Sequence, residues 1–183
     1  MADAGQRPPD LFPLLVLGGA RSGKSSVAQA IAEASGLVPL YVATGEAGDS
    51  EMAARIARHR EARGSHWLLH EEPLDLVGAL AEAAQPGRII LIDCATLWLS
   101  NLMQAGRDLD AEGAALTAAL RTAPCPIIIV SNEVGQGIVP ENALARRFRD
   151  AQGRLNQRLA AQCPRVMLVV AGLSLPIKPS SRL

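Results

Sequence analysis

The chain has 183 residues, a length typical of one domain, and its 18 Lys and Arg residues balance its 18 Asp and Glu residues. Because the formal net charge is zero, no global electric field draws the protein toward nucleic acid or an anionic membrane. Hydrophobic residues make up 49% of the chain but aromatic residues only 3%, so the core must be built from Ala, Leu, Ile and Val. This composition favours helices packed on strands.

The beginning of the chain and its cysteines are typical of a cytoplasmic protein. Residues Met1–Pro9 are polar and contain no apolar segment of signal-peptide length. No later apolar run approaches the roughly 20 residues that a membrane-spanning helix needs. The cysteines are odd in number and unevenly spaced, which fits neither a disulfide framework nor a paired metal-ligand motif. We therefore expect a cytoplasmic protein, frayed at residues 1–10 and 179–183, with reduced core thiols at Cys94, Cys125 and Cys163.

Apolar runs and helix-forming stretches alternate along the chain. Leu14–Leu17 is apolar throughout and ends in glycines, as in a strand buried on both faces. Helix-forming residues then fill Ser25–Ser35, and Gly36 is a typical helix stop. The segments that we predict after it, in chain order, are strand Pro39–Ala43, helix Ser50–Arg63, helix Leu74–Ala84, strand Arg88–Ile92, helix Ala95–Ala105, helix Ala111–Thr122, strand Pro126–Val130, helix Glu141–Gln162 and strand Arg165–Val170.

This alternation predicts one three-layer α/β domain over residues 1–183, with a mainly parallel central sheet and helices on both faces. Ligands of such sheets bind beyond the carboxyl ends of the strands. The segments that directly follow the strands are therefore the candidates for the chemistry.

The first of these segments matches the phosphate-binding P-loop pattern, between the strand and the helix that the pattern requires. Its glycines let backbone N–H groups converge on an anion, toward which the next helix points its positive dipole end. We expect Lys24 to neutralise the β- and γ-phosphates and Ser25 to bind Mg²⁺, whereas Arg21 could contact phosphate or face solvent. The alternative is an ordinary glycine turn. The predicted P-loop residues are Gly18, Gly19, Ala20, Arg21, Ser22, Gly23, Lys24 and Ser25.

Asp93 directly follows the apolar run Ile89–Ile92, the position of the acidic residue that holds Mg²⁺ in P-loop enzymes. A carboxylate there would complete the magnesium site with Ser25. The alternative is that Asp93 caps the helix predicted from Ala95 onward. We favour the magnesium role.

The P-loop alone fits kinases, ATPases, GTPases and motor proteins, but further segments resemble one family. That family is the bifunctional adenosylcobinamide kinase and adenosylcobinamide-phosphate guanylyltransferase of cobalamin biosynthesis. The resemblance covers nearly the whole chain from Leu14 to Lys178. Besides the P-loop, the segments that carry it are Glu51–Ile56 with His59 and Arg60, Trp67 with Glu71–Pro73, Asp93–Leu102, Asn132–Asn142 and Arg146–Gln157.

The resemblance implies two reactions. A nucleoside triphosphate, ATP or GTP, phosphorylates the aminopropanol hydroxyl of adenosylcobinamide. GMP is then transferred from GTP to adenosylcobinamide phosphate, with loss of pyrophosphate. The family's second reaction passes through a GMP-histidine, and the matching residue is His59. The family also implies a homo-oligomer, with homotrimers among the relatives.

The residues around His59 suit this chemistry. A helix over Ser50–Arg63 would surround His59 with arginines, which favour the neutral, nucleophilic imidazole and stabilise charge on the attacked phosphorus. The alternative is an exposed histidine on a solvated, arginine-rich helix face. His66 and His70 lie outside the motif, and we expect them in a loop or at a strand edge.

The resemblance also implies further nucleotide contacts. Glu71 could bind the guanine edge or ribose hydroxyls, or it could cap a helix, and we favour guanine. The loop Asn132–Pro140 could bind cobinamide, complete a subunit contact or merely connect two elements. Trp98–Met103 could be interface or core. Ion pairs in solvent are the default, and contact with a substrate phosphate the alternative, for Arg146, Arg149, Asp150, Arg154 and Asn156. The implied contacts are Ala43, Thr44, Gly45, Arg60, Glu61, Ala62, Arg63, Glu71 and Asp93.

Two other functions fit the sequence less well. One is a P-loop small-molecule kinase or NTPase without guanylyltransferase activity, because such a reaction needs no residue equivalent to His59. The other is a nucleotide-regulated binding module without turnover.

Overall fold

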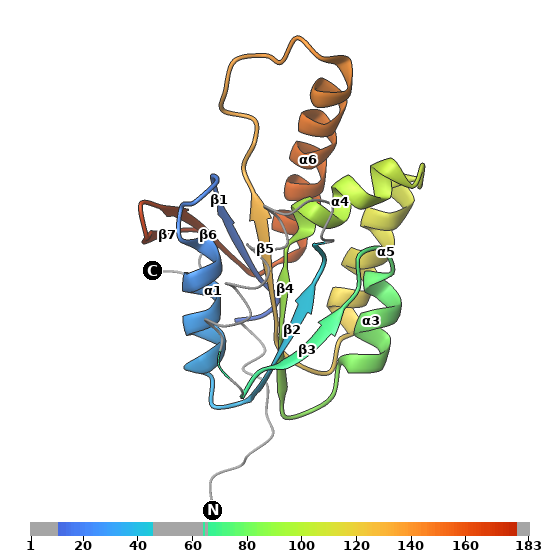
Figure 1. Ribbon diagram of the computed structural model, residues 1–183. Coiled ribbons are helices and arrows are strands. Elements are labelled where there is room, and N and C mark those ends of the chain that lie inside the picture. The colour runs from blue at the N-terminus through green and yellow to red at the C-terminus, as the bar shows by residue number, and fades with distance from the viewer. Residues whose placement is uncertain (1–10, 46–63, 65, 179–183) are drawn as a thin grey trace, which may run out of the picture.

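A computed structural model describes residues 11–45, 64 and 66–178 and has at its centre a seven-stranded sheet in the order β3-β2-β4-β5-β1-β6-β7 (Figure 1). Neighbouring strands are parallel except β6 and β7, which form an antiparallel pair. The mainly parallel sheet is therefore as predicted. The strands are β1 (Leu14–Gly18), β2 (Val38–Ala43), β3 (Leu68–Glu71), β4 (Arg88–Asp93), β5 (Ile127–Asn132), β6 (Arg165–Val170) and β7 (Leu173–Lys178).

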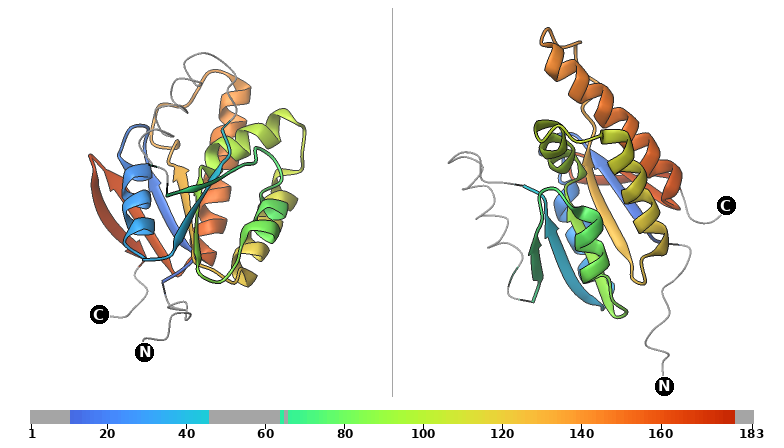
Figure 2. Two further views of the ribbon diagram at one scale, coloured as in Figure 1. Left: turned by 60° about the horizontal axis from the view of Figure 1, so that its bottom comes forward. Right: turned by 90° about the vertical axis from the view of Figure 1, so that its right-hand side faces the viewer.

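Helices cover both faces of the sheet and complete the three layers (Figure 2). The first helix packs on one face, in an apolar cluster with Leu14, Val16 and Leu91. The other described helices pack on the opposite face, where Leu15, Leu17 and Ile92 belong to a second cluster. The helices are α1 (Lys24–Glu33), α3 (Leu76–Ala83), α4 (Ala95–Gln104), α5 (Leu109–Thr122) and α6 (Ala143–Gln162).

The central strands alternate in the direction of their side chains, as the pleat of a strand requires. On β1, Leu14 and Val16 face α1, whereas Leu15 and Leu17 face the other helices, and all four side chains are at most 9% exposed. A strand buried on both faces must be apolar at every position. This explains why the sequence runs of the central strands are continuous rather than alternating.

The sequence predicted the five strands with continuous apolar runs, β1, β2, β4, β5 and β6, to within a few residues. It also predicted all five of the described helices. It missed two outer strands: β3, whose residues are mostly exposed, and β7, which is exposed throughout and contains Pro176. The helix predicted over Ser50–Arg63 lies outside the described residues.

The core settles one open alternative and confirms the prediction for the cysteines. Trp98, Leu99 and Leu102 are at most 2% exposed within the single chain, and the Trp98 indole donates a hydrogen bond to the Leu74 carbonyl at 2.8 Å, so this segment is core. The three cysteines are buried and free, as predicted. None of the described helices is both long and apolar enough to cross a membrane.

Candidate nucleotide-binding site

The candidate site residues meet at one edge of the sheet because they follow neighbouring parallel strands. In the register of the strands, Ala43 at the end of β2 is opposite both Glu71 of β3 and Asp93 of β4. On the other side of β4, strand β5 separates Asp93 from β1, which leads directly into the P-loop. Five separate chain segments thereby contribute to one carboxyl-end edge, where ligands of open α/β sheets bind.

The P-loop joins β1 to α1 in a tight turn whose conformation depends on glycine. Gly23 is the N-cap of α1 and has a φ of 92°, a left-handed value that glycine adopts without strain. A Cβ atom on Gly18 would lie 2.6 Å from the carbonyl oxygen of Val169, which is too close for any other residue. The loop can therefore present backbone N–H groups at the positive end of α1, as an anion-binding site requires.

Lys24 is the first residue of α1 and is only 7% exposed. Its Nζ donates a hydrogen bond to the carbonyl oxygen of Gly19 at 3.0 Å, so the ammonium group lies against the loop rather than in bulk solvent. Ser25 is partly exposed beside it, and Gly19, Ala20 and Arg21 are exposed. A cation held this close to the loop is well placed to neutralise phosphate oxygens.

The turn between β6 and β7 packs against the backbone of the P-loop. The backbone N–H of Gly172 donates to the carbonyl oxygen of Ser22 at 2.8 Å. A Cβ atom on Gly23 would lie 3.1 Å from Cα of Gly172, so the two backbones are in close contact. The strand β7 that the sequence analysis missed therefore belongs to a hairpin that helps to fix the shape of the P-loop.

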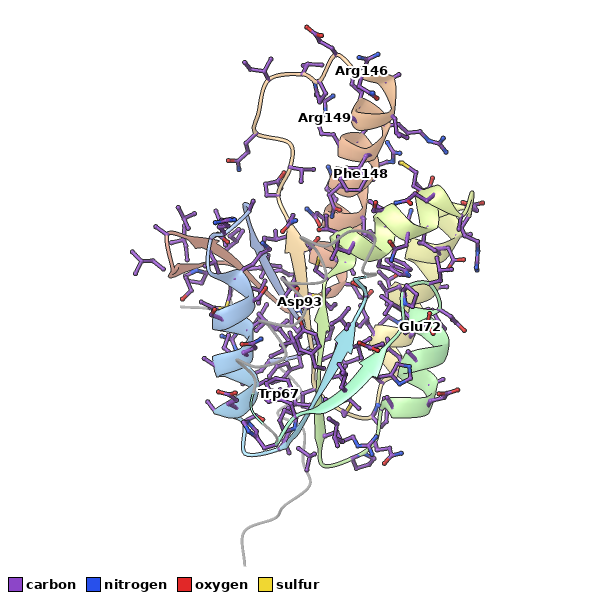
Figure 3. All side chains as sticks on the ribbon, viewed as in Figure 1. Trp67, Glu72, Asp93, Arg146, Phe148 and Arg149 are labelled. Carbon is purple, nitrogen blue, oxygen red and sulfur yellow. The ribbon has the colours of Figure 1, made fainter. Side chains whose placement is uncertain are left out.

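Asp93 ends β4 (Figure 3). The Tyr41 hydroxyl donates a hydrogen bond to Asp93 Oδ2 at 3.0 Å. Asp93 does not cap the next helix, because the N-cap position of α4 is Cys94 and no side chain caps it. Tyr41 is itself packed edge-to-face against Trp67, with ring centroids 6.2 Å apart. The Asp93 carboxylate is thus partly exposed at the sheet edge, and its orientation is fixed by the hydrogen bond from Tyr41.

The donor set fits Mg²⁺ in the way that nucleotide sites usually do. Mg²⁺ prefers oxygen ligands, and it is commonly bound by one or two protein groups together with phosphates and water. Ser25 would supply a hydroxyl and Asp93 a carboxylate. Within the described part of the chain, no group of three or more His, Cys, Asp or Glu side chains could hold a metal without such help.

Thr44 has a structural task at this edge. Its hydroxyl donates to the carbonyl oxygen of Cys94 at 2.7 Å and accepts from the Cys94 N–H at 2.8 Å. Asn101 donates from its side-chain nitrogen to the carbonyl oxygens of Thr44 and Pro73, at 2.8 and 3.1 Å. Thr44, which is fully buried, therefore ties the end of β2 to the chain just after Asp93. The predicted nucleotide contact at Ala43, Thr44 and Gly45 stays a prediction.

Glu71 is exposed at the end of β3, so its carboxylate can reach a ligand. The neighbouring residues Glu72 and Asp75, and not Glu71, make the capping hydrogen bonds. Glu72 accepts from the N–H groups of Leu74 and Asp75, both at 2.8 Å, and Asp75 caps α3 by accepting from Gly78 at 2.9 Å. No capping bond of Glu71 is seen among the described residues.

His59 and the segment Arg60, Glu61, Ala62 and Arg63 lie outside the described residues, and their roles remain predictions. His66 is exposed, with Nε2 3.6 Å from Glu33 Oε1. His70 lies within β3, so one of the two histidines outside the motif is indeed a strand residue.

The segment from Glu133 to Asn142 leaves β5, projects beyond the sheet edge and returns as α6 (Figure 1). Ile138 is 97% and Val139 61% exposed, and Arg146 donates to the Pro140 carbonyl at 2.8 Å. On α6, Arg149 pairs with Asp150 at 2.9 Å, as expected of a solvated helix. Asn156 is different from the prediction: it is 6% exposed and hydrogen-bonded inside the protein.

A parallel sheet with a P-loop after β1, a carboxylate after β4 and helices on both faces defines a P-loop nucleotide-binding enzyme. Comparison with protein families makes this specific, since residues 14–177 match the family described as cobinamide kinase / cobinamide phosphate guanyltransferase. The chain belongs to this family. It is accordingly a bifunctional transferase, with a kinase and a guanylyltransferase activity.

Individual relatives agree with this assignment. The chain is 50% identical over 166 residues to the bifunctional adenosylcobalamin biosynthesis protein CobP of Pseudomonas aeruginosa, covering 90% of this chain and 96% of that protein. It is 43% identical over 180 residues to the proteins named CobU of Escherichia coli and Salmonella typhimurium, covering 90% of this chain and 99% of each relative. Among solved structures, a protein from Pyrococcus horikoshii OT3 shares the fold at 8% identity, with a TM-score of 0.54 over 91% of this chain and 85% of that chain.

Proposed function

We propose that a single nucleotide site at the carboxyl edge of the sheet serves both reactions, phosphorylation of adenosylcobinamide and GMP transfer to its phosphate. The observation that carries this proposal is the strand register, which aligns Glu71, Ala43 and Asp93 on neighbouring strands, with only β5 between Asp93 and the P-loop strand β1. One bound triphosphate could therefore meet the P-loop with its phosphates and Glu71 with its base.

In the kinase reaction, the P-loop backbone from Gly18 to Gly23 would hold the β- and γ-phosphates, and Lys24 would neutralise the charge that develops on them. Ser25 and Asp93 would hold Mg²⁺, which supplies further charge neutralisation between the phosphates when it is bound. The hydroxyl oxygen of cobinamide forms a bond to the γ-phosphorus while the bond to the leaving diphosphate breaks. The contribution of the protein is alignment and electrostatic stabilisation.

In the guanylyltransferase reaction, the nucleophile would be His59. An imidazole nitrogen forms a bond to the α-phosphorus of GTP as the bond to pyrophosphate breaks, which leaves GMP on the histidine. The phosphate of adenosylcobinamide phosphate then attacks the same phosphorus and releases the imidazole. Arg60 and Arg63 would pair with phosphate oxygens, and Glu71 would accept hydrogen bonds from guanine.

Substitution of His59 by Ala tests this division of labour. Incubation of the wild-type protein with GTP labelled in the α-phosphate should leave acid-labile GMP on the protein, and His59→Ala should abolish that label. The kinase reaction should survive, because it needs the P-loop and Mg²⁺ but no histidine. Labelling of the variant at unchanged stoichiometry would show that His59 is not the nucleophile.

The matched control is His66→Ala. Both histidines come between β2 and β3 in the sequence, and both variants replace a histidine by alanine. His66 is exposed. This variant should label with GMP as the wild type does. A loss of label in both variants would point to a general effect on the segment instead of a covalent role for His59.

We also propose a cytoplasmic homo-oligomer, with a homotrimer as the expected assembly. The absence of a membrane-spanning helix among the described residues is compatible with this location. The exposed apolar side chains Ile138 and Val139 on the projecting loop and Leu144 at the start of α6 support self-association, because exposed apolar side chains are common in interfaces. The partners would be adenosylcobinamide and its phosphate, GTP and ATP, and not nucleic acid or a membrane.

A further inference from the structure

Asn132 ends β5, the strand that lies between the P-loop strand β1 and the Asp93 strand β4. Its Cα atom is opposite Gly18, the first residue of the P-loop. Val130, two residues earlier on β5, is opposite Asp93. Asn132 therefore sits at the sheet edge between the two groups that are expected to hold the phosphates and Mg²⁺.

The pleat of β5 decides which face the Asn132 side chain occupies. Ile128 and Val130 belong to the apolar cluster on the α1 side, together with Leu91 and Val16. Side chains two residues apart on a strand share a face, so Asn132, Asp93 and Gly18 all continue onto the α1 side. This is the side from which Lys24 and the P-loop approach.

The backbone of Asn132 is clamped by side chains from two helices. Its N–H donates to Thr96 Oγ1 on α4 at 2.7 Å, and its carbonyl oxygen accepts from Asn156 Nδ2 on α6 at 3.0 Å. The next residue is fixed as well, because the Glu133 N–H donates to the carbonyl oxygen of Gly18 at 3.1 Å. These bonds leave little freedom in the direction of the Asn132 side chain.

The clamp belongs to a buried polar network on the opposite face of the sheet. Gln152 donates to Ser131 Oγ and to Asn156 Oδ1, both at 2.9 Å, and Ser131 donates to Asn156 Oδ1 at 2.7 Å. Thr96, Ser131, Gln152 and Asn156 are all at most 6% exposed. Such a network is costly to assemble in a core, and it rigidifies what it contacts.

The side-chain oxygen of Asn132 is buried, and no partner for it is found among the described residues. A buried amide at a ligand-binding edge without a protein partner points to a partner outside the protein chain. A half-turn of the carboxamide exchanges its oxygen and its NH₂ group, so the same position can present a donor to a phosphate oxygen. We propose that Asn132 is a further active-site residue of the kinase reaction, whose carboxamide hydrogen-bonds the phosphoryl group in transfer, and that the Thr96–Ser131–Gln152–Asn156 network positions it.

The proposed step adds a donor and no new chemistry. The hydroxyl oxygen of the acceptor bonds to the γ-phosphorus as the bond from that phosphorus to the β,γ-bridging oxygen breaks, and the hydroxyl proton is released to water. Asn132 exchanges no proton. With the carboxamide turned so that its NH₂ group faces the nucleotide, an N–H donates to a γ-phosphate oxygen, a bond that strengthens as charge develops in the transition state.

The test compares two asparagines that differ in position. Asn132→Ala should lower the single-turnover rate of phosphoryl transfer to cobinamide about 100-fold, the usual effect of losing one transition-state donor. The nucleotide dissociation constant should change less than about threefold, because most of the phosphate contacts remain. Asn132→Asp, which keeps the size of the side chain, should be at least as slow and is the variant to measure should Asn132→Ala unfold.

The matched control is Asn142→Asp. Asn142 caps α6 by accepting from Leu144 and Ala145, and aspartate caps a helix equally well. This variant should retain the wild-type rate. A rate within twofold of wild type in Asn132→Asp, or equal losses in the two Asp variants, would overturn the proposal. The wild-type rate in the same assay tests the proposed kinase reaction by itself. Because His59 takes no part in phosphoryl transfer, the result does not depend on the proposed guanylyltransferase step.

The positioning network has its own test. Gln152→Leu removes the two hydrogen bonds donated by Gln152 at similar volume, and it should slow phosphoryl transfer about tenfold without weakening nucleotide binding. In the Asn132→Ala background the same change should have no further effect on the rate. A rate loss that is fully additive in the double variant would mean that the network supports the fold alone, and would remove it from the proposal.

Discussion

Tyr41 is the residue whose side chain bears most directly on the proposed magnesium site. Its hydroxyl is the donor to Asp93 Oδ2, and its ring is held in the core at 5% exposure. Groups that orient a metal ligand typically change metal affinity 10- to 100-fold when they are removed. Tyr41→Phe should therefore raise the Mg²⁺ concentration for half-maximal kinase activity about tenfold, as a magnesium titration would show.

The control for this variant is nucleotide binding in the presence of EDTA, which should match the wild type because the P-loop contacts do not involve Tyr41. An unchanged magnesium requirement would mean that Asp93 does not hold the metal, or that Tyr41 does not orient it. A shift in both measurements would indicate a general disturbance of the edge.

For single residues, local sequence patterns predicted the P-loop and Asp93. They did not predict the contacts between residues that are far apart in the sequence. Gly18–Ser25 and Asp93 are recognisable because glycine spacing and a strand followed by a carboxylate are properties of neighbouring residues. Tyr41 and Asp93 are 52 positions apart, and the hydroxyl of Thr44 bonds to a residue 50 positions away. Only the pairing of β2 with β4 brings such residues together, so no short motif could indicate their roles.

Among the elements, the two missed strands have a common physical cause. A strand in the centre of a parallel sheet is buried on both faces, and its continuous apolar run is easy to recognise. β3 has four residues at an edge, and β7 is exposed on both faces. Edge strands are often short or interrupted by proline, and Pro176 interrupts β7. Their sequences consequently resemble loops.

The packing of β1, the P-loop and β6 predicts unequal effects for two adjacent glycines. A Cβ atom on Gly18 would meet the Val169 carbonyl oxygen at 2.6 Å, whereas one on Gly19 would meet nothing within 4 Å. Gly18→Ala should destabilise the protein by about 1–3 kcal/mol, the usual cost of overpacking. Gly19→Ala should leave thermal stability close to wild type, since its methyl group points into open space.

Thermal unfolding of both variants measures the difference. For a chain of this length, 1 kcal/mol corresponds to a shift of about 2–4 °C in Tm. Equal Tm values for the two variants would mean that β6 and the P-loop can separate at little cost, contrary to their close packing.

At the scale of the whole molecule, buried thiols report on both layers of the core. Cys94 belongs to the cluster on the α1 side and Cys163 to the cluster on the other side. Burial raises the pKa of the Cys94 thiol from 9.0 to about 11, with the negative charge of Asp93 adding to it. Burial also raises the pKa of the Cys163 thiol, to about 12. Both groups are therefore protonated throughout the neutral range and unreactive as nucleophiles.

These shifts predict how stability depends on pH. A pKa that is higher in the folded state than in the unfolded state contributes stability that is complete below pH 9 and is lost as the pH rises toward the folded-state pKa. Between pH 8 and pH 10, each thiol should cost roughly 1.3 kcal/mol of the free energy of unfolding. Urea unfolding with a reductant present at these two pH values measures the sum.

The double variant Cys94→Ala/Cys163→Ala separates the thiols from the other groups that titrate in this range. Its absolute stability will be lower because two side chains are shortened in the core. Its loss between pH 8 and pH 10, however, should be smaller than that of the wild type by about 2–3 kcal/mol. Equal losses in the two proteins would mean that the thiols ionise in the folded state at their ordinary pKa, and hence that water reaches both layers. A difference of half the expected size would assign that access to one layer, which the two single variants would identify.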